Sequence, residues 1–386
     1  MKPLIAPLAI ALAFAPLASC NAAPAQPNGG KAVGAAGFAI EDHGTFEEPW
    51  ALAFAPGTSV LFVTERGGRI KFVDTVSGRL GTVSGGPTVD YGGQGGLGDI
   101  AFLPAEAAAT LGRRTIYLSW AEAGQGDTRG TAVGRGTLVC EEADACRIDG
   151  LRVIWRQDPK VAGRGHYSHR LLVSPDGKHL FVASGDRQKM TPAQDLSNNL
   201  GKIVRLLPDG RPAPGNPFAA RGGVAREIWS YGHRNILGLA FDSAGRLWDL
   251  EHGPAGGDEL NRVEPGRNYG WPVVSYGDHY DGRAIPRPNT RNDMAGAVIS
   301  WNPVIAPGGF IWYSGDLFPQ WKGQAIIAGM VYPGLVRVET SGLRLSEAER
   351  INLGKRIRAI VQAPDGAIWI AEDKSGARLR RLAPKR

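Results

Sequence analysis

The chain has 386 residues, of which 21% are charged, and it contains 54 glycines and 27 prolines. This composition is typical of a globular protein rich in turns and strands, and the length suits one large all-β domain as well as two smaller ones. The net charge of +7 is spread along the sequence without a basic block interleaved with aromatics, which argues against nucleic acid as a partner.

The N-terminal segment has the organisation of an export signal. A short basic start precedes an apolar stretch over residues 3–17, which is too short to span a membrane as a helix. The following Leu17-Ala18-Ser19-Cys20 resembles a bacterial lipobox, in which cleavage leaves the cysteine to carry lipid. An ordinary secretory signal cleaved nearby is the alternative. We therefore expect residues 1–20 to form a lipoprotein-type signal segment that is cleaved ahead of Cys20, and the protein to be periplasmic, with a lipid anchor on Cys20 at the outer membrane as its membrane contact.

Residues 21–44 begin with a stretch rich in Ala, Gly and Pro, and we predict a flexible tether there, followed by a domain over residues 45–386. If Cys20 is lipidated, Cys140 and Cys146 remain as a pair. An oxidising compartment favours a disulfide between them across a short acidic loop. Two cysteines without a nearby histidine make a weak metal site.

A theme repeats from about residue 45 onward: a turn rich in Pro, Asp or Gly, a short apolar strand, and then charged or small residues. Clear copies are "APGTSVLFVTERGG", "SPDGKHLFVASGDR", "DSAGRLWDLEHG" and "APDGAIWIAEDKSG", and two weaker copies are "LGRRTIYLSWAEA" and "WKGQAIIAGMVYPG". Their strands start at roughly 60-residue intervals, which predicts six supersecondary units and an all-β, six-bladed β-propeller rather than a sandwich. We expect the repeated strand to be the innermost of each blade, so that its end faces a central channel. The predicted starts are Leu61, Ile116, Leu180, Leu247, Ala325 and Ile368.

Several strand ends carry residues suited to chemistry. In "GGQGGLGDIAF", Gln94 offers an amide within a glycine-rich loop that lets backbone approach a ligand. A neutral histidine such as His166 can accept a proton, and a carboxylate such as Asp186 would orient its ring. We expect His169 and His179 to be surface residues instead.

Three further motifs suggest a site for anions and cations. Arg234-Asn235 places a fixed cation beside an amide, which suits a carboxylate or a developing oxyanion, or simply holds a loop. The Gly-Pro turn of "EHGPAGGDELN" exposes carbonyls, and Asp258 and Glu259 add oxygen ligands suited to calcium. Arg356 and Arg358 share one face of a strand, where a bound polycarboxylate would neutralise them, unless both are solvated.

Taken together, these motifs resemble the soluble aldose sugar dehydrogenases that use pyrroloquinoline quinone (PQQ), a family related to soluble quinoprotein glucose dehydrogenase. The resemblance covers about residues 45–385, and its most specific part runs from Asp195 to Trp271. The motifs that carry it are "GGQGGLGDIAF", "GHYSHRLLVSPDG", "AQDLSNNLGKIVRLLPDG", "EIWSYGHRNILGLAFD", "EHGPAGGDELN", "GRNYGWP" and "KRIRAIVQAPDG". The family is a six-bladed propeller, in agreement with the repeat count.

The resemblance implies a role for each matching residue. His166 matches the general base that takes the proton from the C1 hydroxyl of the sugar. In the family, the hydride on C1 then passes to the quinone, and the oxidised sugar leaves as a lactone. Asp186 matches the acid supporting that base, and Gln94 a glutamine at the rim. The pair Arg234 and Asn235 matches the residues that bind the quinone oxygens, and Arg356 and Arg358 match contacts to the carboxylates of the cofactor.

The resemblance also implies calcium. The carbonyls of Gly253 and Pro254 match those that hold the calcium bridging protein and cofactor, and Glu259 with the Tyr269 carbonyl matches a second, structural calcium site. Two departures stand out. The family often has a lysine on the fifth inner strand, but the stretch 329–332 has none. At the expected sugar rim stand Asn302 and Val304, which suggest an open pocket.

The sequence thus predicts a PQQ- and calcium-dependent aldose dehydrogenase that passes electrons to an external acceptor. It has no CXXCH motif for a c-type haem of its own. Two alternatives stay open. One is a non-catalytic propeller that binds a carbohydrate or a protein, and the other is a calcium-dependent hydrolase of the lactonase type.

Overall fold

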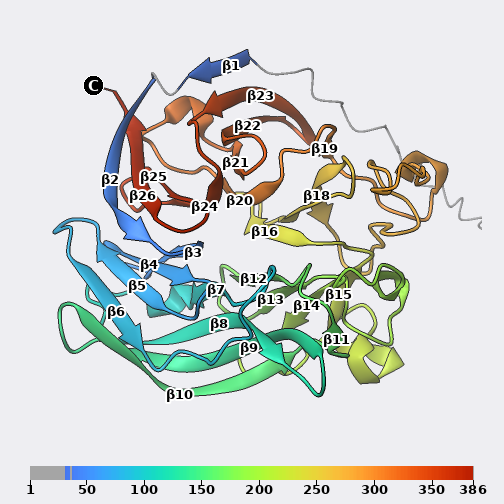
Figure 1. The fold of residues 1–386 in the computed structure, drawn as a ribbon, viewed down its shortest axis with the longest axis horizontal. Helices are drawn as coiled ribbons and strands as arrows, with labels where there is room; N and C mark the ends of the chain where they lie inside the picture. Colours follow the sequence, from blue (N-terminus) through green and yellow to red (C-terminus); the bar gives the residue numbers. More distant parts are fainter. Residues whose placement is uncertain (1–30, 35–36, 386) are drawn as a thin grey trace, which may run out of the picture.

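The computed structural model describes residues 31–34 and 37–385, which form an all-β molecule whose sheets follow one another around a central axis (Figure 1). The signal segment 1–20, with Cys20, lies outside the described residues. The first two runs of strands are β3 (Pro49–Phe54), β4 (Val60–Glu65), β5 (Ile70–Asp74), β6 (Leu80–Ser84), β7 (Leu97–Phe102), β8 (Arg113–Ala123), β9 (Thr128–Val139) and β10 (Ala145–Arg156). They form one sheet, because β10 pairs with β6 in parallel. The short strand β11 (Val161–Ala162) pairs with the first residues of β9.

The later sheets are separate and mostly four-stranded. They contain β12 (Ser168–Val173), β13 (Leu180–Ser184), β14 (Lys202–Leu206), β15 (Ile228–Tyr231); β16 (Ile236–Phe241), β17 (Leu247–Glu251), β18 (Asp258–Val263), β19 (Ile299–Trp301); β20 (Pro307–Trp312), β21 (Ala325–Gly329), β22 (Gly334–Ser341), β23 (Arg344–Asn352); and β24 (Ile357–Gln362), β25 (Ile368–Glu372), β26 (Ala377–Pro384). Short 3-10 helices occur in the connections at Pro104–Glu106, Thr191–Gln194, Ala219–Arg221, Gly223–Glu227, Pro288–Thr290 and Pro319–Trp321.

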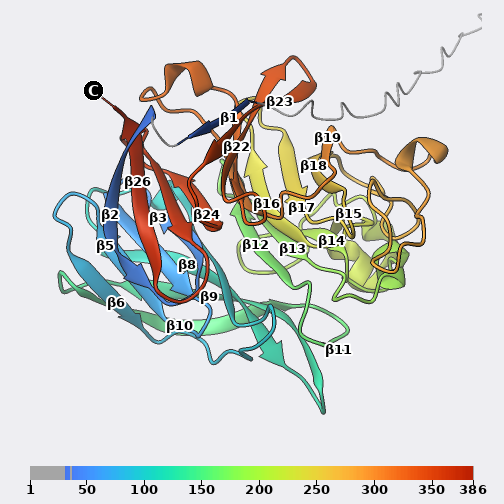
Figure 2. The ribbon, with the colours of Figure 1, turned by 45° about the horizontal axis from the view of Figure 1, so that its top comes forward.

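The strands nearest the axis are β3, β7, β12, β16, β20 and β24, and each contacts the next so that β24 returns to β3 (Figures 1 and 2). The expectation that the repeated apolar strand is innermost is therefore wrong. The repeated segments form β4, β8, β13, β17, β21 and β25, which lie second in their sheets. A second strand is covered on both faces, so it is continuously apolar, as in β13, where every residue is buried. An axial strand such as β12 must also present polar groups to the channel.

The ring closes through the N-terminal strand β2 (Phe38–Phe46), which pairs antiparallel with β26 from Phe38↔Pro384 to Phe46↔Ala377. This pairing contradicts a flexible tether over residues 38–44. The reason is burial: Phe38 packs on Phe318 and Trp321, with ring centroids 5.8 and 5.6 Å apart. In addition, β1 (Lys31–Gly34) pairs in parallel with β23. The folded domain thus begins ahead of the predicted boundary at residue 45.

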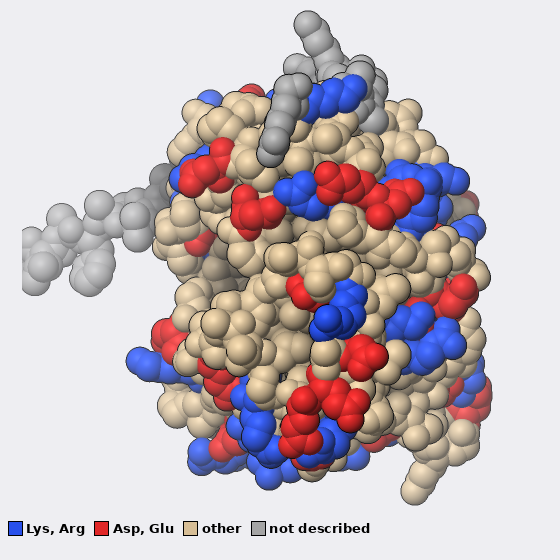
Figure 3. All heavy atoms as spheres, turned by 90° about the vertical axis from the view of Figure 1, so that its left-hand side faces the viewer, with Lys and Arg blue, Asp and Glu red and all other residues tan. Residues whose placement is uncertain are grey.

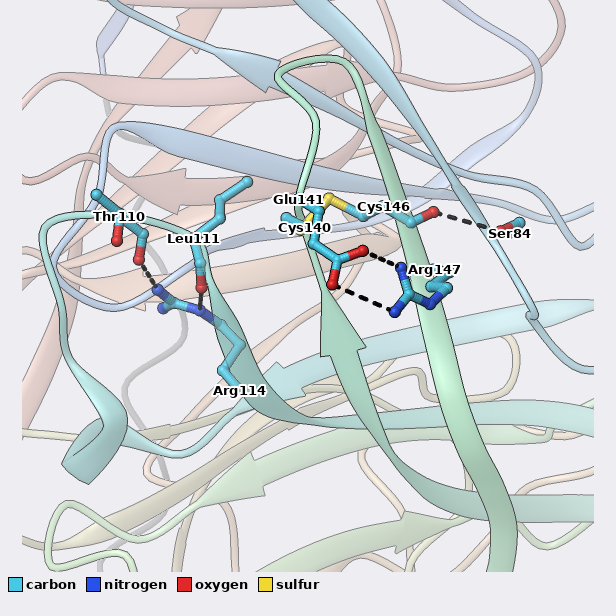
Figure 4. The surroundings of a disulfide bond; sticks show 8 residues. All are labelled: Ser84, Thr110, Leu111, Arg114, Cys140, Glu141, Cys146 and Arg147. Atoms are coloured by element: carbon cyan, nitrogen blue, oxygen red, sulfur yellow. Dashed lines mark hydrogen bonds and ion pairs between the residues drawn. A yellow bond between two sulfur atoms is a disulfide. The ribbon is translucent and has the colours of Figure 1, made fainter.

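The predicted disulfide between Cys140 and Cys146 is present and joins the end of β9 to the start of β10 (Figure 4). An ion pair of 2.6 Å between Glu141 and Arg147 lies beside it, and the Cys146 carbonyl accepts a hydrogen bond from Ser84 on β6. The bond therefore fixes the hairpin at the edge where the two runs of strands meet.

The surface carries both signs of charge in alternation on the face formed around β2 and β26 (Figure 3). The strands there are linked by ion pairs such as Arg378–Asp42 at 3.2 Å and Arg381–Asp365 at 2.8 Å. Within residues 31–34 and 37–385, no helix has the length and apolar character needed to cross a bilayer.

Candidate active site

His166 and Asp186 form a buried pair beside the axis. His166 precedes the axial strand β12, and Asp186 follows its hairpin partner β13, so the hairpin brings both to one end of the sheet. The His166 Nδ1 lies 2.7 Å from the Asp186 Oδ1, and the two residues are 7% and 0% exposed. The structure therefore joins the two residues that the sequence proposed as base and partner.

The loop carrying His166 has an unusual backbone. His166, Ser168 and His169 have φ values of 48°, 63° and 69°, in the left-handed region that residues other than glycine adopt at a cost. The side chain of Gln94 holds this conformation, because its Oε1 accepts a hydrogen bond of 2.7 Å from the His166 amide. Gln94 thus positions the histidine through its backbone.

Asp186 is held by donors on both oxygens. Its Oδ1 accepts from the Gln188 amide as well as facing His166, and its Oδ2 accepts a hydrogen bond of 2.7 Å from the Trp271 indole. Burial opposes ionisation, but these hydrogen bonds and the nearby charges outweigh it and lower the pKa of Asp186 below its usual range. Asp186 is therefore ionised, and it accepts a hydrogen bond from the protonated Nδ1 of His166.

The environment keeps His166 neutral. Burial is the largest effect and lowers its pKa from the usual 6.5; the hydrogen bond to Asp186 raises it, and the charge of Arg234 lowers it further. Because Nδ1 donates to an ionised Asp186, the lone pair of the neutral ring lies on Nε2. Such an imidazole can accept a proton at Nε2 at neutral pH.

His169 is buried, so the expectation of a surface residue is wrong for it. It is 2% exposed, stacks on Tyr167 with centroids 5.2 Å apart, and meets Trp50 edge-on at 5.6 Å. Burial, followed by the charges of Arg187, Arg66 and Arg170, lowers the pKa of His169 to about 3, so it remains neutral. His179, in contrast, is half-buried in the turn before β13.

A cavity of about 270 Å³ lies on the axis next to this pair and is rich in cationic side chains. Gln94, Asn235, Arg356 and Arg358 line it, as the sequence suggests, although neither His166 nor Arg234 is part of its wall among the described residues. Sequence reasoning missed the remaining polar and aromatic wall residues, which include Trp50, Arg66, Tyr167, His169 and His252. Arg66 follows the strand of the first repeat copy, so a search for functional residues at the ends of the repeated strands could have found it.

Arg356 and Arg358 share a face, because both donate to one carboxylate. Their Nε atoms lie 2.8 and 2.9 Å from the two oxygens of Asp373. Burial lowers the pKa of Arg358, whereas hydrogen bonds and charge from both arginines outweigh burial and lower the pKa of Asp373. One carboxylate against two guanidinium groups leaves a net positive charge facing the cavity, which suits a polycarboxylate such as PQQ.

Arg234 stands beside the cavity between two aromatic rings. Its guanidinium carbon lies 5.1 Å from the Trp271 ring and 5.9 Å from the Tyr280 ring, and its Nη1 donates to the Gly253 carbonyl at 2.7 Å. The neighbouring Asn235 lines the cavity and accepts a hydrogen bond from the Ser168 amide. The two residues of the predicted pair therefore face different partners.

All four predicted metal ligands, Gly253, Pro254, Glu259 and Tyr269, line one small cavity of about 10 Å³ together with Glu251. Buried carboxylates concentrate around it: burial, followed by the charge of Glu251, raises the pKa values of Asp249 and Glu259 well above their ordinary values. Oxygen donors whose ionisation is penalised in this way fit a hard cation such as calcium, which would relieve the repulsion.

Asp258 does not join this group, contrary to its candidacy as a ligand. Its two oxygens accept hydrogen bonds from the amides of Gly253, Ile305 and Ala306, and burial raises its pKa to about 6. Asp258 therefore ties the Gly-Pro turn to the next sheet. Instead, His233 lies within 3.2 Å of both Asp249 and Glu251 and extends the polar cluster inward.

The fold and this site define a class: an all-β protein with sheets around an axial, cation-lined cavity and a buried histidine–carboxylate pair beside it. The family profile described as Glucose / Sorbosone dehydrogenase matches residues 46–381. The chain belongs to the glucose/sorbosone dehydrogenase family.

Individual relatives agree with this assignment. The chain is 37% identical over 346 residues to the Aldose sugar dehydrogenase YliI of Escherichia coli, a match covering 88% of this chain and 91% of the relative. The crystal structure of the soluble aldose sugar dehydrogenase from Escherichia coli in the apo-form superposes with a TM-score of 0.83 at 35% identity, covering 90% of this chain and all of that one. The PQQ-bound aldose sugar dehydrogenase of Streptomyces coelicolor gives 0.72 at 26% identity, covering 90% and 98%.

The two departures noted in the sequence have structural counterparts. Met330 and Val331 line the cavity where the resemblance leads one to expect a lysine, and the Met330 carbonyl accepts a hydrogen bond from Arg356. Asn302 and Val304 are not part of the cavity wall among the described residues; the Asn302 side chain instead packs against Gly256.

Proposed function

We propose that this protein oxidises aldose sugars at C1 to lactones, with PQQ as cofactor and calcium as the metal. The observation that carries this proposal is a neutral, carboxylate-oriented His166 next to a cavity whose wall holds Arg66, Arg356 and Arg358. A base beside a cation-lined cavity suits removal of a hydroxyl proton close to an anionic cofactor.

In the proposed reaction, His166 Nε2 accepts the proton of the C1 hydroxyl while Asp186 stabilises the imidazolium that results. Trp271 and the Gln188 amide keep the Asp186 carboxylate in place, and Gln94 keeps the His166 backbone in place. When bound, PQQ supplies the two-electron acceptor for the C1 hydride. The proton acceptor is therefore fixed by the fold before the sugar arrives.

Residues on the cavity wall and beside it would account for cofactor binding. Arg356 and Arg358 would bind carboxylates, because each uses its Nε on Asp373; the Nη1 of Arg356 donates to the Met330 carbonyl, which leaves its Nη2 and the Nη groups of Arg358 for a ligand. Asn235 and Arg234 would bind the quinone oxygens. The Gly253 and Pro254 carbonyls would hold calcium beside the cofactor, and Glu259 with the Tyr269 carbonyl a second ion. Since Gly253 accepts from Arg234 in this structure, Arg234 and calcium would share that carbonyl.

Three further features belong to this proposal. The closed cycle of axial strands corresponds to six blades of a propeller. The protein acts in the periplasm, anchored through lipid on Cys20 or released by an ordinary signal cleavage. Its electrons pass to an external acceptor, since the sequence carries no haem-attachment motif.

Reconstitution tests the function directly. Purified apoprotein receives calcium and PQQ, and reduction of an artificial dye is followed with a panel of aldoses. We expect sugar-dependent dye reduction that needs both additions. Absence of quinone binding at micromolar concentration would favour a non-catalytic binding propeller, and lactone hydrolysis without quinone would favour a lactonase-type hydrolase.

The pH profile of the reconstituted enzyme reports the base. Because burial lowers the pKa of His166 below 6.5 and the neutral form is active, kcat/KM should fall only below pH 6.5. Asp186 raises the pKa of His166, so Asp186→Asn should move this acid limb to still lower pH. An acid limb above pH 6.5, or one that Asp186→Asn leaves unmoved, would contradict the assignment.

A further inference from the structure

Tyr280 is an exposed aromatic side chain attached to the candidate site. It is 78% exposed, yet its hydroxyl oxygen accepts a hydrogen bond of 3.2 Å from the Arg234 Nη2. Arg234 lies between this ring and Trp271, whose indole binds Asp186. Tyr280 is therefore the outermost member of a chain of contacts that leads inward to His166. Its ring stays in water while its polar end is fixed.

The segment that carries Tyr280 is held in place by its backbone. Asp278, in the connection between β18 and β19 (Figure 1), exchanges two backbone hydrogen bonds of 3.0 and 3.2 Å with Ala255, in the connection between β17 and β18. Arg287 forms an ion pair of 2.9 Å with Asp278 and donates to the Gly277 carbonyl. A tight turn follows, in which the His279 amide binds the Arg283 carbonyl at 2.9 Å. The ring thus projects from a braced turn.

The same bracing links Tyr280 to the Gly-Pro turn. A Cβ on Gly257 would come within 2.3 Å of the Gly277 amide, so the two backbones touch at a position that requires glycine, with φ of 72°. The Gly-Pro turn and the turn that carries Tyr280 are therefore in direct backbone contact. An aromatic ring presented rigidly loses little conformational freedom when a ligand stacks on it.

We propose that Tyr280 is a substrate-contacting residue that determines specificity, and that its ring stacks on the apolar C–H face of an aldopyranose. This rests on the proposed function and adds to it a substrate contact beside Arg234. A pyranose has faces of C–H groups and an edge of hydroxyls, which matches a ring whose apolar surface is open and whose hydroxyl is held by Arg234. Val331, which is 57% exposed, provides an apolar surface on the wall of the axial cavity.

The test compares Tyr280→Ala and Tyr280→Phe in the enzyme reconstituted with calcium and PQQ. We expect Tyr280→Ala to raise KM for aldopyranoses by about tenfold, with kcat within about threefold of the wild type, and Tyr280→Phe to keep KM within about threefold. His279→Ala, a change on the same turn, serves as the control and should match the wild type. Thermal unfolding of each apoprotein confirms that the turn is intact.

Two outcomes would overturn the proposal. If Tyr280→Phe raises KM as much as Tyr280→Ala does, the tyrosine acts only through its bond to Arg234. If Tyr280→Ala leaves KM unchanged in an active enzyme, the ring does not touch the sugar. Calorimetric titration of the apoprotein with glucose separates this from a failure of the proposed function: sugar that binds wild type without being oxidised, and binds Tyr280→Ala more weakly, contradicts the enzyme but supports the contact.

Discussion

Replacing His166 is expected to lower kcat for aldose oxidation at least about a hundredfold, because it removes the proposed general base. His166→Asn is the sharper variant. Asparagine tolerates the left-handed backbone with φ of 48° better than alanine does, so loss of activity would not reflect a distorted loop. Dye reduction with saturating calcium and PQQ measures the effect, and equilibrium binding of PQQ shows that the cavity is intact.

His179→Ala is the matched control for this prediction. His179 lies half-buried in the turn before β13, away from the cavity wall, and its removal should leave kcat unchanged. Wild-type turnover by a folded His166→Asn protein would remove the base from the mechanism.

Arg358→Ala is expected to weaken PQQ binding by at least about tenfold, because a carboxylate of the bound cofactor would lose its charged partner. Arg356 would then be the single arginine paired with Asp373. Arg358→Lys should recover little of this affinity. A lysine cannot donate to Asp373 and to a ligand carboxylate through a rigid planar fork. Fluorescence titration of the apoprotein with PQQ measures the dissociation constant without turnover.

Arg381→Ala is the control, since Arg381 forms a surface ion pair with Asp365. Exposed pairs contribute little, so this variant should bind PQQ as the wild type does. Unchanged affinity in Arg358→Ala would mean that the cavity cations do not hold the cofactor.

The repeat could be found from the sequence, but the place of the repeated strand in its sheet could not. The run Leu180–Ser184 is apolar because both of its faces are covered, and this makes it the easiest strand to see. The axial strand β12 reads Ser-His-Arg-Leu-Leu-Val, and its polar start looks like a loop until the hairpin places it at the channel. Burial on two faces and proximity to the axis are different properties, and the pattern reports only the first.

The parts of the site that lie in recognisable sequence motifs could be predicted, whereas the parts whose surroundings depend on tertiary packing could not. The pairing of His166 with Asp186 was implied by the family resemblance, and the structure brings them to 2.7 Å. His169 has the same side chain three residues later, but it is buried against Tyr167 of its own segment and against Trp50 of β3, in a different sheet. Asp373 follows the repeated strand β25, just as Asp186 follows β13, so a search of the strand ends could have found it as well.

The N-terminal strand has a consequence for how the chain is made. The bond between Asp42 and Arg378 joins residues 336 positions apart, so β2 has no partner until nearly the whole polypeptide is available. Long-range pairing of this kind is slow and leaves strand edges unprotected meanwhile. Loss of the last eight-residue strand would strip β2 as well and open the ring between its first and last sheets. The last strand therefore closes the ring of sheets, and we expect truncation of β26 to leave the protein incompletely folded and readily degraded.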